Sequence, residues 1–298
     1  MSQICILAAL AGAAFVSPVL VSAPASPVAL VMGDEVGAAY KKIVEERAAT
    51  IVTIKYVLKQ GDEEQEEEVQ GVMIEEGGLV MTSNTLMGGV PEAYKRMMGG
   101  RMRSPKDIKV MVGDDNEGVD AKLVARDSEL DLAWVQITKV EGKKFKFVDL
   151  AKSGKAELGD RLLVVERLGK FMDRSPVVAE SRVKAVVSKP RNLVLPGSEF
   201  ASSFGMPAFN DKAEFVGTCV LQLPSAEEME ASQGGMFGGL RNFRGAVVLP
   251  AEDVVKATVQ AKETAKSGKP VDEEPPADAN KDAEDAGDKK DEKKPGDK

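Results

Sequence analysis

Short runs of aliphatic and β-branched residues, separated by turn-forming residues, recur along most of this chain. The separators include Gly61-Asp62, Glu76-Gly77-Gly78 and Gly113-Asp114-Asp115. Many short strands divided by such turns favour an all-β sandwich or barrel. The predicted strands cover residues 50–58, 69–74, 78–82, 108–112, 120–125, 131–137, 161–166, 177–187, 214–223 and 245–249.

Two helices are predicted at the ends of this β region. The first is a short amphipathic helix over 37–46. The second covers 251–265, and its apolar side is expected to carry Val254, Val255, Val259 and Ala261. Between the first two predicted strands, the acidic run 62–68 is interpreted as a hairpin turn.

Residues 1–25 have the features of a signal peptide. Residues 4–21 are almost continuously apolar, and Ala23-Pro24-Ala25 has the form of a signal-peptidase site. Pro18 favours this interpretation, whereas the lack of Lys or Arg in Met1-Ser2-Gln3 weakens it. An uncleaved N-terminal membrane anchor is the alternative, because the stretch is close to the length that spans a bilayer. The expected location is therefore exported, either periplasmic or extracellular, with the anchor left open.

The amino-acid counts exclude several kinds of chemistry. There is no histidine, so no imidazole can act as a general base or bind a metal. The net charge of −8 argues against a nucleic-acid partner, which a basic face would attract. Cys219 is expected to be a buried packing residue, and it would stand alone once the segment containing Cys5 is removed. We expect no cofactor and no metal.

The composition changes after Lys266. Residues 269–298 are mostly Lys, Asp, Glu, Pro, Ala and Gly, with Val271 as a single larger apolar residue. Such a segment cannot bury enough apolar surface to offset its ordering entropy, so 267–298 is predicted to be a disordered tail. A solvated tail and a partner-binding tail both remain open. Two further segments, 94–103 and 234–244, combine Gly, Met and Arg and are interpreted as unconstrained insertions or adaptable binding loops.

Several segments resemble HtrA/Deg-type trypsin-like proteases. Residues 71–84, which end in Thr82-Ser83-Asn84, are similar to the strand pair that precedes the family's catalytic histidine. Residues 121–133 resemble the stretch that ends in its catalytic aspartate, here Asp131. Residues 150–162 are similar to the start of its second barrel, and 246–250 to its last strand. The resemblance spans about residues 38–265, and it implies two six-stranded antiparallel β-barrels.

The departures from that family concern its catalytic residues. Thr85 stands where the family has histidine, and Phe204 stands where it has the nucleophilic serine. The Gly-Asn-Ser-Gly-Gly-Pro motif is replaced by Ser202-Ser203-Phe204-Gly205-Met206-Pro207, so glycines of the oxyanion loop become Ser202 and Met206. Asp131 alone keeps the family's residue, and we expect a turn or capping role or a new hydrogen bond with Thr85. Ser202, Ser203, Gly205 and Met206 form a degenerate oxyanion loop and the candidate binding site.

These observations predict an all-β, two-barrel fold. Its boundaries are a linker over 26–36 and a double-barrel domain over 37–266, with barrel one at about 50–140 and barrel two at about 145–250. The resemblance, with its departures, predicts a secreted pseudoprotease that binds a protein or an extended peptide. The alternatives are a hydrolase with a shifted serine and a lysine base, or a structural envelope protein. A membrane partner is expected only if the N-terminal segment stays uncleaved, and the oligomeric state is left open.

Overall fold

A computed structural model describes residues 27–60, 63–91, 103–140, 142–224, 245–267 and 271. The chain divides into two compact units, Met1–Gly37 and Ala38–Lys298. The second unit contains all the strands. The predicted signal peptide, residues 94–102 and 234–244 of the two Gly/Met/Arg segments, and residues 268–270 and 272–298 of the predicted tail lie outside the described residues.

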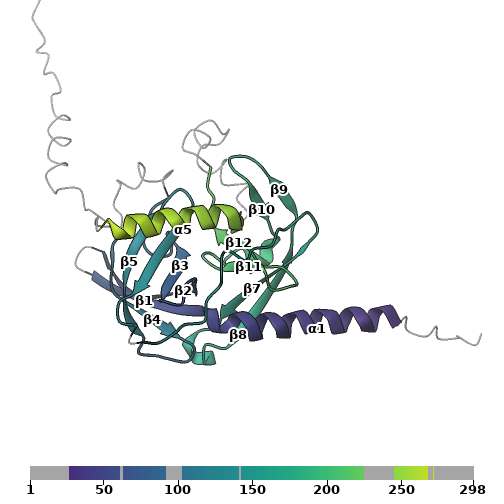
Figure 1. Ribbon diagram of the computed structural model, residues 1–298, viewed down its shortest axis with the longest axis horizontal. Helices are drawn as coiled ribbons and strands as arrows, with labels where there is room; N and C mark the ends of the chain where they lie inside the picture. The colour runs from purple at the N-terminus through teal and green to yellow at the C-terminus, as the bar shows by residue number, and fades with distance from the viewer. Residues whose placement is uncertain are drawn as a thin grey trace, which may run out of the picture. The chain divides into compact units, whose positions relative to one another are not determined.

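The second unit is built almost entirely of antiparallel strands (Figure 1). The elements of the first half are α1 (Pro27–Arg47), η1 (Ala48–Thr50), β1 (Ile51–Gln60), β2 (Glu63–Met73), β3 (Leu79–Ser83), β4 (Pro105–Val112), β5 (Val119–Asp127) and β6 (Leu132–Ile137). Those of the second half are β7 (Arg161–Arg167), η2 (Lys170–Met172), β8 (Pro176–Arg182), β9 (Ala185–Val187), β10 (Leu193–Leu195), η3 (Ser198–Phe200), β11 (Pro207–Phe209), β12 (Phe215–Val220), β13 (Val247–Pro250) and α5 (Ala251–Lys266).

The first six strands form a closed barrel in the order β1-β2-β3-β6-β5-β4. Successive side chains of a strand point to opposite faces, and here both faces are buried in β3. Val80 packs inside the barrel with Ile54 and Val135, whereas Leu79 and Met81 belong to a larger core that continues into the second sheet. This double burial explains why β3 reads as a continuous apolar run rather than an alternating one.

The second sheet has seven strands in the order β8-β7-β11-β12-β13-β10-β9. The predicted two-barrel, all-β fold is confirmed, but this half is not a closed barrel of six strands. The predicted strand 177–187 is divided, because Val183 N donates to Asp160 O (2.9 Å) and the next residue, Lys184, donates to Leu195 O (2.8 Å). One stretch of chain therefore pairs first beside β7 and then beside β10, which counts as two strands.

The acidic run 62–68 is not a turn. Residues from Glu63 onward form the first part of β2, and they pair with β1 in an unbroken register. Lys55 Nζ lies 2.8 Å from Glu66 Oε2 across this pair. Opposite charges on neighbouring strands stabilise the pairing by a few tenths of a kcal/mol to about 1 kcal/mol, which allows a glutamate-rich strand to form.

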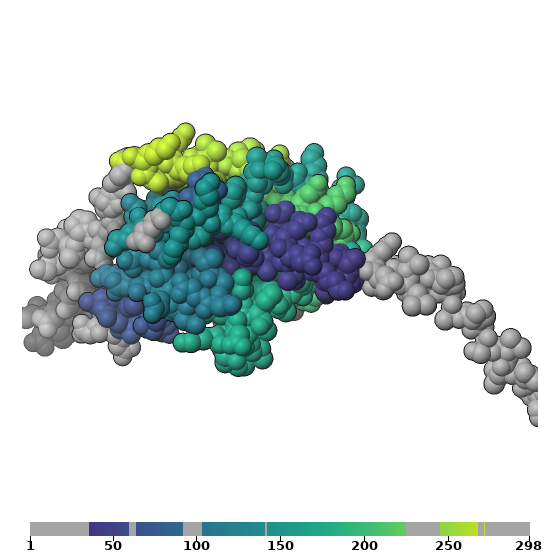
Figure 2. Space-filling model, turned by 60° about the horizontal axis from the view of Figure 1, so that its bottom comes forward, coloured from purple at the N-terminus to yellow at the C-terminus, as the bar shows by residue number. Residues whose placement is uncertain are grey.

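Both predicted helices are present. Helix α1 begins at Pro27, so its first turns cover residues predicted to be a linker. Helix α5 crosses both halves and contacts β5 at one end and β12 and β13 at the other, and Figure 2 shows it as the yellow ridge on the surface. Trp134 Nε1 donates to Thr258 Oγ1 beneath it (3.3 Å). Val254 is buried as expected, but Val259 is 53% exposed because it lies beside the packed face.

No helix among the described residues has the length and apolar character needed to cross a membrane.

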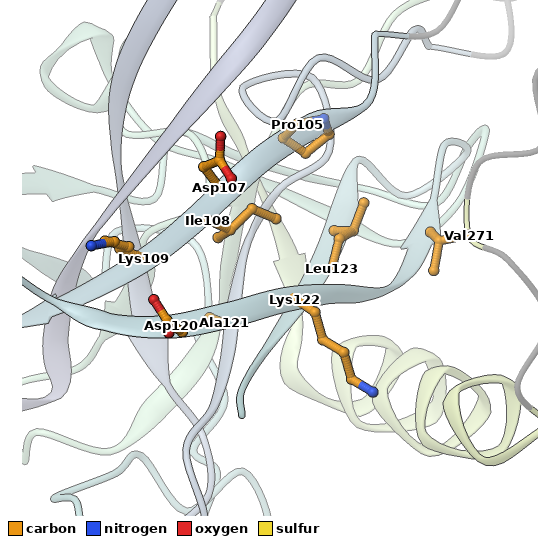
Figure 3. Close-up of a pocket in the computed structure, with 9 residues that line it drawn as sticks. All are labelled: Pro105, Asp107, Ile108, Lys109, Asp120, Ala121, Lys122, Leu123 and Val271. Atoms are coloured by element: carbon orange, nitrogen blue, oxygen red, sulfur yellow. The ribbon is translucent and has the colours of Figure 1, made fainter. Parts of the chain in front are cut away.

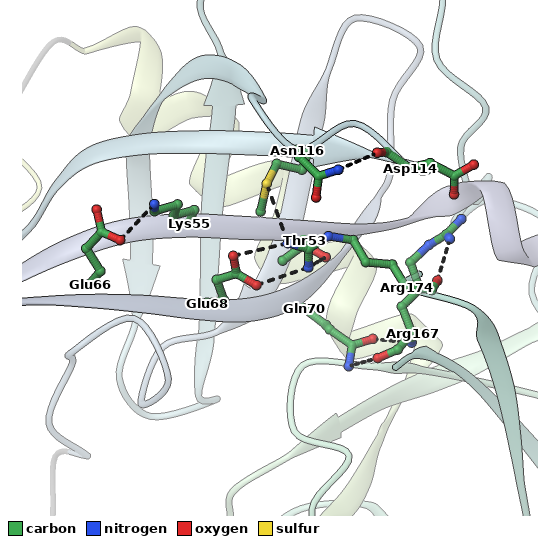
Figure 4. Close-up of polar contacts among 10 residues, drawn as sticks. Thr53, Lys55, Glu66, Glu68, Gln70, Asp114, Asn116, Arg167 and Arg174 are labelled. Atoms are coloured by element: carbon green, nitrogen blue, oxygen red, sulfur yellow. Dashed lines mark hydrogen bonds and ion pairs between the residues drawn. The ribbon is translucent and has the colours of Figure 1, made fainter. Parts of the chain in front are cut away.

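A polar cluster joins β1 and β2 of the barrel to β7 of the second sheet (Figure 4). Gln70 and Arg167 exchange two hydrogen bonds, from Arg167 N to Gln70 Oε1 (2.6 Å) and from Gln70 Nε2 to Arg167 O (3.0 Å). The Arg167 guanidinium also donates to Ile51 O (2.9 Å) and Ala48 O (2.7 Å). Because buried donors left unpaired cost about 1–3 kcal/mol each, this cluster holds the two halves in one arrangement.

We predict that Gln70→Ala lowers the free energy of unfolding by about 1–3 kcal/mol, because Arg167 N and O lose their partners together. Denaturant unfolding followed by tryptophan fluorescence measures the change. Gln65→Ala is the matched control, since Gln65 lies exposed on the same strand, and it should cost less than about 0.5 kcal/mol. Equal losses in the two variants would contradict a joining role for Gln70.

Candidate functional site

Four segments meet where the two halves of the fold touch. They are the end of β3, the turn before β6, the end of β12 and the loop 202–206. The turn brings Asp131 to the position where β3 ends, because β3 and β6 pair from Leu79↔Gln136 to Ser83↔Leu132. Asp131 itself has a φ of +57°, which the short Asp side chain tolerates better than most.

The carboxylate of Asp131 is the centre of this meeting point. It is 2% exposed and accepts hydrogen bonds from three residues. Ser83 Oγ donates to both oxygens (2.9 and 3.1 Å), and Thr85 N donates to Oδ1 (2.8 Å). Leu221 N, which follows β12, donates to Oδ2 (2.9 Å). One carboxylate thus fastens the ends of β3 and β12, which belong to different halves.

The electrostatics of Asp131 are a balance between burial and hydrogen bonding. Burial raises the pKa of Asp131 above its ordinary value, and the donors Leu221 N, Thr85 N and Ser83 Oγ lower it again. Burial is the larger effect. The Thr85 hydroxyl also lies close to the carboxylate, but among the described residues its buried Oγ1 has no partner with hydrogen-bond geometry.

Arg126, which is not among the site residues predicted from the sequence, holds the segment after β3. Arg126 NH1 donates to Asn84 Oδ1 (2.8 Å), and NH2 donates to Met87 O (2.8 Å). Thr85 therefore lies in a segment that is held from both sides, by Asp131 and by Arg126. The sequence signal was present, because Arg126 lies in the segment 121–133 and Asn84 ends the segment 71–84.

The loop 202–206 lies against the end of β3. Gly205 N donates to Cys219 O (2.7 Å), and Cys219 N donates to Met206 O (2.8 Å). Gly205 has a φ of +79°, and a Cβ there would lie 2.5 Å from Ser83 N. Only glycine fits such a position without displacing backbone. Gly205 thus allows the loop to touch the end of β3, where Ser83 hydrogen-bonds to Asp131.

The other side chains of this loop are arranged for packing. Phe204 is half-buried against the shared core, and Met206 is 2% exposed. Ser203 is buried and Ser202 is exposed. Within the described part of the chain, neither serine hydroxyl hydrogen-bonds to a lysine or a carboxylate. The structure thus brings Thr85 and Asp131 into contact and places the loop beside them.

Residues 69–217 match the model of the trypsin-like peptidase domain, which is half of the chain. The match includes Thr85, Asp131 and Phe204. The chain belongs to this family. At the positions of this trypsin-like domain that resemble the catalytic ones, the chain carries Thr85, Asp131 and Phe204.

Among solved structures, the apo protease domain of MamO from Magnetospirillum magneticum is similar to this trypsin-like domain. It is 16% identical, and the match covers 71% of this chain and 97% of that chain, with a TM-score of 0.46. No curated protein matches the chain.

We predict that Asp131→Asn destabilises the fold by about 2–3 kcal/mol, because the new NH₂ group faces a backbone N–H and leaves that buried donor unpaired. Thermal and denaturant unfolding measure the loss. Asp149→Asn is the control, since the partly exposed Asp149 side chain makes only local contacts, with Ala151 N and with Lys152 Nζ.

The pH dependence supplies a second readout for Asp131. The pKa of Asp131 is higher in the folded protein than its ordinary value of 3.8. Asp131 therefore contributes its full free energy of stabilisation below pH 3.8, and this contribution is lost as the pH rises through the folded pKa. The stability difference between wild type and Asp131→Asn should therefore narrow as the pH rises through that window. A difference that widens with pH would contradict the raised pKa.

Proposed function

We propose that this chain is an exported, non-catalytic member of the trypsin-like family that binds a protein or an extended peptide. The observation that carries the proposal is the pair Thr85 and Phe204 at the catalytic positions, in a chain without histidine. A trypsin-like hydrolase needs a base that removes the proton of the nucleophile and a nucleophile that attacks the carbonyl. Threonine cannot accept a proton at neutral pH, and the phenylalanine ring has no nucleophilic atom.

The oxyanion loop supports the same conclusion. Catalysis in this fold depends on backbone N–H groups aimed at the developing charge, and one such donor is worth about 10²–10³ in turnover. Here the loop has side chains at Ser202 and Met206 in place of glycine, and Met206 is packed into the core. The half-buried ring of Phe204 lies where a scissile carbonyl would enter.

A binding role is favoured by two features of the fold, a rigid frame and an incompletely paired strand edge. Two packed halves joined by buried hydrogen bonds form a rigid frame, and a rigid frame loses little entropy on binding. The strands β4 and β5 pair with each other only at Lys109↔Asp120 and Val110↔Val119, although each is much longer. Extended peptides bind to such incompletely paired strand edges through backbone hydrogen bonds.

The hydrolase alternative needs a contact that the described residues do not form, and the structural alternative leaves the incompletely paired strand edge without a role. A hydrolase with a shifted serine would need Ser202 or Ser203 beside a basic group, and neither hydroxyl has such a partner there. A purely structural envelope protein would need neither an exposed strand edge nor a groove. Export is proposed on the apolar segment 4–21 and the Ala23-Pro24-Ala25 site alone.

We predict that the purified protein cleaves neither unfolded casein nor activated esters. It should also fail to react with serine-directed fluorophosphonates, because an unactivated serine is a weak nucleophile. Mass spectrometry of the treated protein measures labelling, with an active trypsin-like enzyme as the positive control. Labelling at Ser202 or Ser203 that disappears in the corresponding Ser→Ala variant would contradict the proposal.

We further predict that Thr85→His with Phe204→Ser stays inactive. The two substitutions restore the side chains of a triad with Asp131, but Ser202 and Met206 still replace the glycines of the oxyanion loop. Adding Ser202→Gly and Met206→Gly should be necessary before any hydrolysis appears.

A burst assay with an activated ester compares the double and quadruple variants. Circular dichroism monitors folding, because Met206→Gly empties a buried position. Thr85→His with Phe204→Ala is the matched control without a nucleophile. Turnover by the double variant above this control would mean that the oxyanion donors are already in place.

A further inference from the structure

The closed first barrel has an opening between the ends of β4 and β5, which pair with each other at only two positions. Beyond Lys109 and Asp120, β4 and β5 no longer pair with each other, and each pairs only with its outer neighbour. Pro105 and Lys106 continue along β1, and 121–123 continue along β6. The facing edges of β4 and β5 therefore diverge from one another.

A bulge in β4 explains this divergence. Lys109 lies opposite Lys55 of β1, and Lys106 lies opposite Val57, so three steps on β4 match two steps on β1. Asp107, within the bulge, has a φ of +49°. Bulges bend a strand and increase its local twist, which turns this end of β4 away from β5.

The opening is a cavity of about 600 Å³. Its apolar walls come from both strands, with Pro105 and Ile108 on β4 and Ala121 and Leu123 on β5 (Figure 3). This volume is in the range of sites that bind small ligands and short peptides. Its walls combine apolar side chains with incompletely paired strand edges, which is the character of an extended-peptide site.

A residue from beyond α5 already lines this cavity. Val271 belongs to its wall, although it lies well over a hundred residues further along the chain than β4 and β5. Figure 3 shows it on the same side of the opening as Leu123. Only residues 267–270 separate it from the end of α5. A ligand attached through so short a linker has an effective concentration in the millimolar range, so even a weak contact is populated.

The sequence beyond Val271 carries carboxylates that two lysines near the cavity can attract. Asp272, Glu273 and Glu274 follow it in sequence. Lys122 lines the cavity and extends toward α5, where it also lines a smaller pocket together with Lys266. Neither lysine forms an ion pair with another described residue. The lining also contains Asp107, Asp120 and Lys109, and Asp120 lies directly opposite Lys109 in the strand register.

We propose that the opening between β4 and β5 is the peptide-binding site of this protein, and that the C-terminal segment beginning at Val271 occupies it in cis. The ligand chemistry is an aliphatic side chain in the apolar opening followed by carboxylates near Lys122 and Lys266. The inference rests on the proposed peptide-binding function, for which it names the site. A partner with the same chemistry would have to displace the tail.

Hydrogen exchange on the full chain tests the cis contact. Val271→Asp should increase exchange at 105–108 and 121–123 by about three- to tenfold, because a charged side chain is expelled from an apolar site. Ala277→Asp, further along the same tail, is the matched control and should leave these segments unchanged. No increase in Val271→Asp, or an equal increase in both variants, would overturn the proposal.

A peptide in trans tests the site itself. A fluorescent peptide of residues 268–278 should bind full-length Val271→Asp at least about tenfold more tightly than wild type, whose own tail competes. Lys122→Glu, introduced into Val271→Asp, should weaken that binding about tenfold, whereas Lys212→Glu on the second sheet should not. Absence of binding, or equal weakening by both lysine variants, would overturn the site.

These experiments separate the inference from the proposal on catalysis. Hydrogen exchange and peptide binding report occupancy of the β4–β5 opening, whereas fluorophosphonate labelling reports activity at the loop 202–206. Labelling together with tail binding would overturn only the non-catalytic role. If the protein is not labelled and the tail does not bind, only the inference about the β4–β5 opening is overturned.

Discussion

The buried carboxylate of Asp131 is the interaction on which the arrangement of this molecule depends. It accepts hydrogen bonds from Ser83 and Thr85 at the end of β3 and from Leu221 at the end of β12. One carboxylate therefore joins strand ends from both halves of the fold. A buried carboxylate is tolerated only when its oxygens are satisfied, and here backbone N–H groups supply most of the donors. None of these contacts needs an imidazole. Asp131 therefore has a structural task that is independent of catalysis.

The fold combines a rigid centre with an open edge. Asp131 and the Gln70–Arg167 pair join the halves where they meet. At the opposite side of the first barrel, the bulge at Asp107 separates β4 from β5 and leaves their facing edges incompletely paired. A protein without a working triad can still offer such an edge, because backbone hydrogen bonding requires only strand geometry. The site proposed for binding is thus distinct from the degenerate catalytic positions.

Most of the strands could be predicted because their apolar residues recur with short spacing between turns. The strands β10 and β11 were missed, since each has only three residues and too little pattern to recognise. The acidic part of β2 has the pattern of a turn, and it forms a strand because cross-strand partners such as Lys55 stabilise it. The division of 177–187 followed from a change of partner between Val183 and Lys184, which no local pattern reveals.

The sequence by itself determined the chemistry that is absent, because no arrangement of a chain without histidine can create an imidazole. It also determined where most of the strands lie along the chain, and it placed Thr85, Asp131 and Phe204 at the catalytic positions of the family pattern. Only the tertiary structure decided what these residues contact. The donors to Asp131 come from segments 46 and 90 residues away along the chain, and Val271 lines an opening formed by β4 and β5. Such contacts depend on strand register and bulges, which arise when distant segments pair and are not encoded in any single stretch.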